Sequence, residues 1–465
     1  MLGEDILYLT VRELSHRIRS RKLSPVELTE SYLKRSEAIG ARLNAYATLT
    51  GDLALREAQQ AEREIRAGKY RGPLHGIPYA AKDLLAVKGY PTTWGARPFA
   101  NQRFDYDATV IKKLRAAGAI LIGKAAMIEL AGGMGYRFAS ASISGAAKNP
   151  WDQTCWTCGS SSGSGAIASA ALAVFAIGTE TWGSIVCPSA FCGASGLRPT
   201  YGRVSRHGAM ALSFSMDKIG VMGRTADDCG LVLAQIAGHD AQDPASLSDA
   251  AFSYNSGPSA KPLRIGWLTN AWKKIPSDIE SAVNTSVNVL KQNGAVIKEA
   301  KLPEGPWEAA AGTVISVEGA AAFESLIESG RVAELNDPLG RVAAYVNQQI
   351  PASDYVRAVR IRAVLQKKMD ELFERFDVIA TASLPVTASP LTANLETDLD
   401  FADPLGGIGN FCGLPAVSVP CGFDSRKLPV GIQFVGRALD EHKVIAAARL
   451  FQHNTDWHRR RPPLS

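Results

Sequence analysis

Short apolar runs and longer stretches with apolar positions at helical spacing follow one another along this chain of 465 residues. Apolar runs that predict buried strands lie at 74–80, 119–122, 265–268 and near Val296. The helices predicted around them cover 53–67, 107–117 and 276–293. Strands that alternate with helices are typical of α/β proteins, so we expect that fold class.

The N-terminal segment, residues 1–70, is predicted to be mainly helical. Residues 10–13 and 24–27 both fit the capping box, in which Ser or Thr is followed three positions later by Glu. The second of them also has Pro25 at the first helical position, where a missing N–H costs nothing. Gly40 is the expected end of this second helix.

The C-terminal part departs from this regular alternation. Residues 300–375 are predicted to be mostly helical, whereas 383–405 are rich in Pro, Thr and Asp and predict a loop. We therefore expect a variable region at about 300–405 that shapes a substrate pocket. The last predicted elements are two closing strands at 417–419 and 430–435 and a final helix at 441–452.

Composition and charge exclude several classes of protein. A formal charge of +6 is small for this length and gives no reason to expect a nucleic-acid partner, and the basic run 458–461 is interpreted as a solvated tail. No apolar run reaches about 18 residues, and no signal peptide is visible at the start, so no membrane partner is expected. Seven cysteines, an odd number, do not indicate a disulfide framework. A soluble, cytoplasmic protein in a reducing compartment is the expectation.

Three residues in the first half of the chain are candidates for catalysis. Ser160 lies in the Gly- and Ser-rich run 158–165, and Ser184 follows Gly183 at the end of a second conspicuous run. The first run is also compatible with a flexible linker, but the apolar residues that follow it predict a buried helix. Lys82 follows an apolar segment. A lysine and two serines are sufficient for a hydrolase without histidine.

At these residues the chain resembles the amidase signature family. The matching positions are 82–83, 123–124 with Glu129, 158–165, 183–184, 196–200, 413–416 and 428–431. The resemblance extends over roughly 70–240 and 376–450. It implies one large domain across residues 1–465, with a mixed, twisted central sheet covered by helices. It also implies an enzyme without metal or organic cofactor.

The resemblance assigns a role to each candidate. Ser184 would be the nucleophile, and the backbone amides of Thr181, Trp182, Gly183 and Ser184 would form the oxyanion hole. Ser160 would carry a proton between Ser184 and Lys82, and the peptide bond between Gly159 and Ser160 would be cis. Ser161 and Ser162 are expected to support this loop, and the sequence leaves a part in the relay open to them.

Lys82 must lose its charge to act as the base, and burial beside apolar residues lowers the pKa of a lysine. Asp83 next to it would oppose that shift if both side chains faced the site. Adjacent side chains on a strand point to opposite faces, so Asp83 is predicted to have a structural role away from the site.

The chain also departs from the commonest pattern of the family. Glu180 and Trp182 replace Asp and Gly, and Val186 replaces an arginine, which removes a possible ion pair. The indole of Trp182 is expected either to line the acyl pocket or to pack behind the turn, and both interpretations stay open.

Two further motifs lie near these residues. Gly132, Gly133 and Met134 are expected in a loop that faces the substrate, although a plain glycine turn would look the same. Cys155 and Cys158 have the spacing of redox or zinc sites, but no second pair or suitably spaced histidines accompany them. We interpret this spacing as a coincidence and expect no metal.

Together these features predict an amidohydrolase that cleaves a C–N amide bond through an acyl-enzyme on Ser184. The substrate would be a small-molecule amide, carbamate or ester, and a homodimer is compatible with this function. A first alternative, which the resemblance also allows, is the amidase (A) subunit of a tRNA-dependent amidotransferase. A second is a catalytically inactive binding protein, against which the intact Lys82, Ser160 and Ser184 argue.

Overall fold

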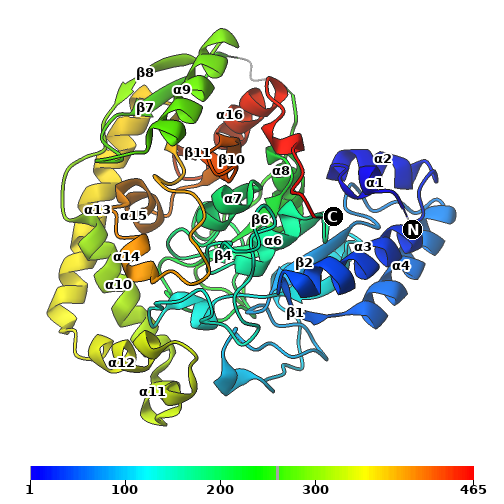
Figure 1. Ribbon diagram of the computed structural model, residues 1–465, viewed down its shortest axis with the longest axis horizontal. Coiled ribbons are helices and arrows are strands. Elements are labelled where there is room, and N and C mark those ends of the chain that lie inside the picture. The colour runs from blue at the N-terminus through cyan, green and yellow to red at the C-terminus, as the bar shows by residue number, and fades with distance from the viewer. Residues whose placement is uncertain (1, 258–260, 465) are drawn as a thin grey trace.

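A mixed sheet of eleven strands forms the centre of the computed structural model, which describes residues 2–257 and 261–464 (Figure 1). The strands are β1 (Tyr46–Leu49), β2 (Pro78–Lys82), β3 (Ile120–Ala125), β4 (Phe175–Glu180), β5 (Ser195–Arg198), β6 (Lys218–Gly223), β7 (Arg264–Leu268), β8 (Val296–Ala300), β9 (Val378–Ala382), β10 (Ala416–Phe423) and β11 (Pro429–Gly436). Their order across the sheet is β1-β3-β2-β4-β6-β5-β10-β11-β9-β7-β8. This single α/β domain is the predicted fold class.

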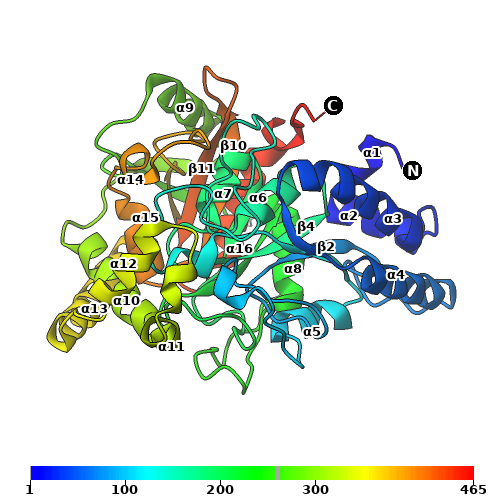
Figure 2. The same ribbon diagram turned by 60° about the horizontal axis from the view of Figure 1, so that its bottom comes forward.

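Helices cover the sheet and extend beyond both of its edges (Figures 1 and 2). They are α1 (Glu4–Leu7), α2 (Val11–Arg19), α3 (Pro25–Arg35), α4 (Gly51–Arg66), α5 (Thr109–Ala116), α6 (Ser162–Ser169), α7 (Val186–Cys192), α8 (Ala226–Ile236), α9 (Ser277–Gln292), α10 (Trp307–Ala322), α11 (Glu324–Glu328), α12 (Pro338–Asn347), α13 (Ala352–Arg375), α14 (Leu395–Asp398), α15 (Pro404–Phe411) and α16 (Glu441–His453). Within the described ranges, no helix is long and apolar enough to cross a membrane.

Most of the predicted elements are present, with differences that have local causes. Thr10 forms the predicted capping box with Glu13. At α3 half of the predicted box forms: the Ser24 hydroxyl accepts from the amide of Glu27 and donates to Glu62, but the Glu27 side chain does not accept from the amide of Ser24. Asp107 does not cap α5, because its carboxylate accepts from the amide of Lys88 and from Arg115.

The two predicted closing strands are present as β10 and β11. They lie in the interior of the sheet, and β1 and β8 form its two edges. Strands buried on both faces are mostly apolar, as β11 is, and that pattern does not reveal which strands flank them.

The pairing of β2 with β4 brings two distant parts of the chain together. The two strands are parallel and in register, with Tyr79 opposite Phe175 and Ala81 opposite Ile177. Both strands therefore end at the same edge, where Lys82 comes close to Thr179. Ligands and active sites of open α/β sheets lie at such carboxyl ends.

Glycines on neighbouring strands allow α6 and α7 to pack closely on the sheet. A Cβ atom at Gly178 would meet Ser161, and one at Gly196 or Gly220 would meet Ile185. These close contacts bring the N-terminal ends of α6 and α7 next to the end of β4. Figure 2 shows both helices beside β4 at the centre of the molecule.

The predicted variable region forms one side of the molecule. Helices α10 to α13 lie together at the periphery, and α15 packs between them and the sheet (Figure 1). Their apolar side chains form a second core cluster, which includes Val314, Leu365 and Phe411. The N-terminal helices lie at the opposite side, so the centre of the sheet is enclosed from both directions.

Candidate active site

Lys82, Ser160 and Ser184 lie in one hydrogen-bonded row at the carboxyl edge of β2 and β4. The Nζ atom of Lys82 donates to Ser160 Oγ at 2.8 Å, and Ser160 Oγ lies 3.0 Å from Ser184 Oγ. All three side chains are buried. The structure thus brings together three residues that are 24 to 102 positions apart in sequence; a proton can pass along this row without crossing solvent.

Each of the three residues stands at the end of an element. Lys82 ends β2, Ser160 precedes α6, and Ser184 lies in the turn between β4 and α7. The peptide bond between Gly159 and Ser160 is cis, as the family resemblance implies. Gly183 has a φ of 79°, a conformation that favours glycine, and open space lies beside its Cα atom.

The turn that carries Ser184 has backbone amides that are not used in hydrogen bonds within the described residues. The amides of Trp182, Gly183 and Ser184 donate no hydrogen bond to any of the described residues. The side chain of Thr181, the fourth predicted residue, donates to Asp217 at 2.6 Å. Unpaired amides beside a serine hydroxyl are what an oxyanion hole requires.

Two more hydroxyl groups contact the amine of Lys82. Its Nζ atom donates to Ser161 Oγ and to Thr179 Oγ1, both at 3.0 Å. The sequence leaves a role for Ser161 open and gives no indication of Thr179. Thr179 escapes prediction because its proximity to Lys82 depends on the register of β2 against β4, which no local motif specifies.

Burial lowers the pKa of Lys82 to about 7, although the carboxylates of Asp217 and Glu180 work in the opposite direction. A pKa near neutrality leaves a large fraction of the amine uncharged at physiological pH. Only the uncharged amine can accept a proton, so the burial of Lys82 supplies the condition for a general base.

Asp83 faces away from Lys82, as the alternation along a strand predicts. Its carboxylate pairs with Lys124 Nζ at 2.7 Å and accepts from the amide of Thr93 at 3.0 Å. Burial lowers the pKa of Lys124, and Asp83 opposes that shift. Asp83 therefore joins β2 to β3 and to the following loop and does not contact the row of hydroxyls.

Glu180 holds the turn that carries Ser184. Its carboxylate accepts from the amides of Ile185 and Val186 at 2.7 and 2.9 Å and pairs with Arg198 at 2.6 Å. Burial opposes this charge, but Arg198 and the Val186 amide keep the pKa of Glu180 at about 2. Arg198, which lies in the motif 196–200, thus supplies the buried ion pair of Glu180.

The indole of Trp182 packs against α15. Its Nε1 donates to Asp403 at 2.9 Å, and its ring lies 3.0 Å from the position that a Cβ atom at Gly407 would take. It also contacts the core cluster that α10, α13 and α15 share. These contacts favour the second of the two interpretations, in which the ring packs behind the Ser184 turn, between that turn and the variable region.

The glycine loop lies close to the site but is turned partly away from it. A cavity of about 180 Å³ is lined by Thr179 and Thr181 on one side and by Ala131 and Leu212 on another. Gly132 follows Ala131 and has a φ of 84°, Gly133 packs against Leu212, and Met134 is buried. Ala131 is thus the loop residue that reaches the cavity.

The cysteines differ from the expectation. Cys158 and Cys187 form a disulfide, with Cα atoms 5.9 Å apart, which an odd cysteine count does not predict. Cys155, the other half of the Cys-x-x-Cys spacing, keeps a free, buried thiol. The disulfide connects the residue before Gly159 to the first turn of α7, so it joins the two segments that carry Ser160 and Ser184.

Comparison with known proteins identifies the family. Residues 27–445 match the family described as Amidase, and the chain belongs to this amidase signature family. It is 36% identical to the A-subunit of the glutamyl-tRNA(Gln) amidotransferase of Acinetobacter baumannii, over 99% of both chains. The A-subunit of the same amidotransferase from Moorella thermoacetica is 35% identical over the same share of both chains.

Solved structures give the same classification. The native peptide amidase of Stenotrophomonas maltophilia superposes with a TM-score of 0.84 and is 31% identical, with 98% of each chain covered. The arrangement of sheet and helices described above is therefore that of amidase signature enzymes.

Proposed function

We propose that this chain cleaves the C–N bond of a small amide through an acyl-enzyme on Ser184. The observation that carries the proposal is the continuous row of hydrogen bonds from Lys82 through Ser160 to Ser184. Burial lowers the pKa of Lys82, the base in this row, to about 7. The family to which the chain belongs supports the same chemistry. The presence of Lys82, Ser160 and Ser184 within hydrogen-bonding distance argues against the alternative of a catalytically inactive binding protein.

The reaction has two halves. Ser184 Oγ attacks the carbonyl carbon while its proton passes to Ser160, and the proton of Ser160 passes to Lys82. The amides of Thr181, Trp182, Gly183 and Ser184 hold the negative oxygen of the tetrahedral intermediate. Lys82 returns the proton through Ser160 to the leaving amine, and the C–N bond breaks.

Water completes the second half by the same path. It loses a proton through Ser160 to Lys82 and attacks the acyl carbon. The proton then returns through Ser160 to Ser184 Oγ as the bond between this oxygen and the acyl carbon breaks, which releases the acid and free Ser184. Carbamates and esters offer the same carbonyl carbon, so we propose them as further substrates. We place the acyl group in the cavity beside Ala131 and Leu212, near the predicted loop of Gly132, Gly133 and Met134.

The second candidate is a role within an amidotransferase, which the 36% identity to the A-subunit of such an enzyme over 99% of both chains favours. A chain in that role would use the same acyl-enzyme but would pass ammonia to a companion chain. The two candidates therefore share the cleavage step and differ in the amide that they accept and in their need for other chains.

Activity of the isolated chain separates the two functions. Purified protein is incubated with an aryl amide, a peptide amide, a carbamate, an ester and glutamine, and the released amine or ammonia is measured. Release from an aryl or peptide amide without other chains supports the hydrolase. Release from glutamine and no other compound, and only after addition of companion chains from the same cells, supports the amidotransferase. Ser184→Ala serves as the blank for contaminating amidases.

A further inference from the structure

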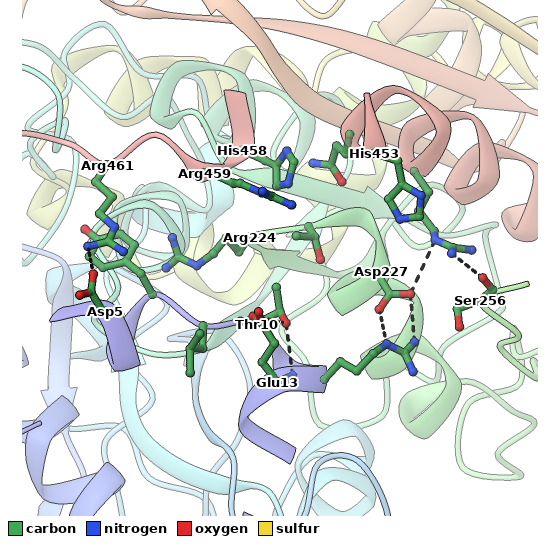
Figure 3. A pocket seen from close by; sticks show the side chains of 16 residues that line it. Asp5, Thr10, Glu13, Arg224, Asp227, Ser256, His453, His458, Arg459 and Arg461 are labelled. Carbon is green, nitrogen blue, oxygen red and sulfur yellow. Dashed lines mark hydrogen bonds and ion pairs between the residues drawn. The ribbon is translucent and has the colours of Figure 1, made fainter. Parts of the chain in front are cut away.

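A second cavity, far from the row of hydroxyls, lies where the two ends of the chain meet. Its volume is about 550 Å³, and it is lined by the N-terminal segment, the start of α8 and the last residues of the chain (Figure 3). The basic side chains on its wall are those of Arg12, Arg224, Arg449, Arg459, Arg461, His453 and His458. None of the residues assigned to catalysis lines it.

The carboxylates of Asp227 and Glu13 on this wall are already engaged. Asp227 accepts from Arg12 at 2.9 Å and from Tyr254 at 2.7 Å, and Arg449 lies 3.7 Å from it. Glu13 accepts from the amide of Thr10 in the capping box. Neither carboxylate is left to neutralise the cations on the other side of the cavity.

Arg224 has no such partner. Within residues 2–257 and 261–464 no carboxylate forms an ion pair with its guanidinium, and Figure 3 draws no hydrogen bond or ion pair from Arg224 to the other lining residues. The guanidinium lies over the ring of Tyr8 at 4.3 Å, and that of Arg461 lies over the same ring at 4.7 Å. Among the described residues, Arg461 forms an ion pair with Asp5 and no other carboxylate, and the Asp5 side chain is 90% exposed.

The surroundings of His458 reflect this surplus of positive charge. Burial first, and then the neighbouring Arg459, lower the pKa of His458 to about 4. Arg224 and His453 act in the same direction, and Asp456 opposes them. The Nδ1 atom of His458 is buried and has no hydrogen-bond partner among the described residues. Of the basic run 458–461, residues 459–461 are exposed, as the sequence predicts, whereas His458 is partly buried.

We propose that this cavity binds the phosphate group of a small phosphorylated molecule. Guanidinium groups donate in a planar fork that matches phosphate oxygens, and the wall offers Arg224, Arg459 and Arg461 from two directions. An anion there offsets the repulsion between cations that now share one aromatic ring. A volume of about 550 Å³ exceeds what phosphate alone fills and accommodates an organic group as well.

Calorimetric titration tests the proposal with two probes, inorganic phosphate and phenyl phosphate. Both are expected to bind the intact chain, and a higher affinity for phenyl phosphate would identify an organic ester as the ligand. Equal affinities would identify free phosphate and overturn the organic part of the proposal. Absence of binding by both probes at low ionic strength would overturn the site itself.

The variant Arg224→Met removes the charge and keeps an apolar side chain against Tyr8. Its affinity for phosphate is expected to fall at least roughly tenfold, the scale of one charged hydrogen bond. Arg437→Met is the matched control, because Arg437 is exposed, pairs with Asp370 and lies outside the cavity. Arg459→Gln, at an exposed position, provides a second test if Arg224→Met does not fold. If Arg224→Met and Arg459→Gln both fold and both bind phosphate with unchanged affinity, the proposed phosphate site is contradicted.

Discussion

At the scale of single residues, the account depends on a lysine whose pKa the fold lowers to about 7. Lys82 is surrounded by Ser160, Ser161 and Thr179, all of which are neutral. Its nearest carboxylates, those of Asp217 and Glu180, favour the charged form, and burial outweighs both. The uncharged amine is thus a product of the fold and not of a specific neighbour.

The pH dependence of the reaction follows from this pKa. The folded-state pKa of Lys82, about 7, lies below the ordinary 10.5, so the base is protonated and inactive below pH 7 and free above it. We expect kcat/KM to rise by roughly tenfold per pH unit below 7 and to level off above about 8. A rate profile measured between pH 5 and 9 on an aryl amide checks this.

Substitution of Lys82 separates the base from the remaining site. Lys82→Met is expected to lose roughly 10²–10⁴ in kcat/KM and the rising limb with it. Lys82→Arg is also expected to fail, since a guanidinium stays protonated. Near-full activity in the arginine variant would remove Lys82 from the mechanism.

The three catalytic candidates can be predicted from the sequence because each lies in a local motif. Thr179 cannot, since a threonine inside an apolar strand carries no local sign of function. Its role becomes visible only when β4 is placed beside β2. Trp182 stands out in the sequence as a departure, but its contact with Asp403 depends on a segment 221 residues away.

At the scale of elements, two segments must be held in register for the serines to meet. The segment before α6 carries Ser160, and the turn before α7 carries Ser184. Glu180 fixes the second segment through the amides of Ile185 and Val186, and the disulfide between Cys158 and Cys187 connects the two. The disulfide closes a loop with a sequence separation of 29.

Removal of the disulfide is therefore expected to affect both stability and rate. For a loop of this length the chain-entropy model gives a loss of roughly 3–4 kcal/mol in the free energy of unfolding. The double variant Cys158→Ser, Cys187→Ser should show this loss in urea unfolding, together with a lower kcat. Cys421→Ser is the control, as Cys421 is buried on β10 and free. An equal effect in both variants would mean that burial of a hydroxyl, not the loss of the disulfide, is the cause.

The elements themselves can be predicted unevenly. Helices with marked polar and apolar faces, such as α4 and α9, are predicted within a few residues of their ends. The positions of β10 and β11 in the sheet are not, because neighbours in a sheet are chosen by the packing of the whole domain. The disulfide between Cys158 and Cys187 cannot be predicted for the same reason, because the spacing of these two cysteines in the sequence does not mark them as partners.

At the scale of the whole molecule, Trp182 connects the catalytic turn to the variable region. Its indole contacts α15, and through the shared core cluster it contacts α10 and α13. The region at about 300–405 is predicted to shape the substrate pocket, and this contact gives it a route to the Ser184 turn. Selectivity for the acyl group is therefore expected to depend on the size of residue 182.

The variant Trp182→Gly tests this connection. It removes the ring but keeps the backbone amide, so the oxyanion hole should persist while space opens between the Ser184 turn and α15. We expect kcat/KM for a large acyl group to increase relative to that for a small one. In transition-state free energy, the difference should be about 1–3 kcal/mol for each additional methylene. Trp182→Phe is the matched control, because it keeps most of the volume and removes only the donor to Asp403. A constant ratio over a graded series of acyl groups would show that the ring does not line the pocket.

The central claim is that Ser184 forms the acyl-enzyme, and covalent labelling tests it most directly. Intact chain is treated with a fluorophosphonate, and the modified peptide is identified by mass spectrometry. The account predicts one label, on Ser184, and none in Ser184→Ala, whose fold is checked by thermal unfolding. A label on Ser160, Ser161 or any other serine, or a label that persists in the folded Ser184→Ala variant, would contradict the account.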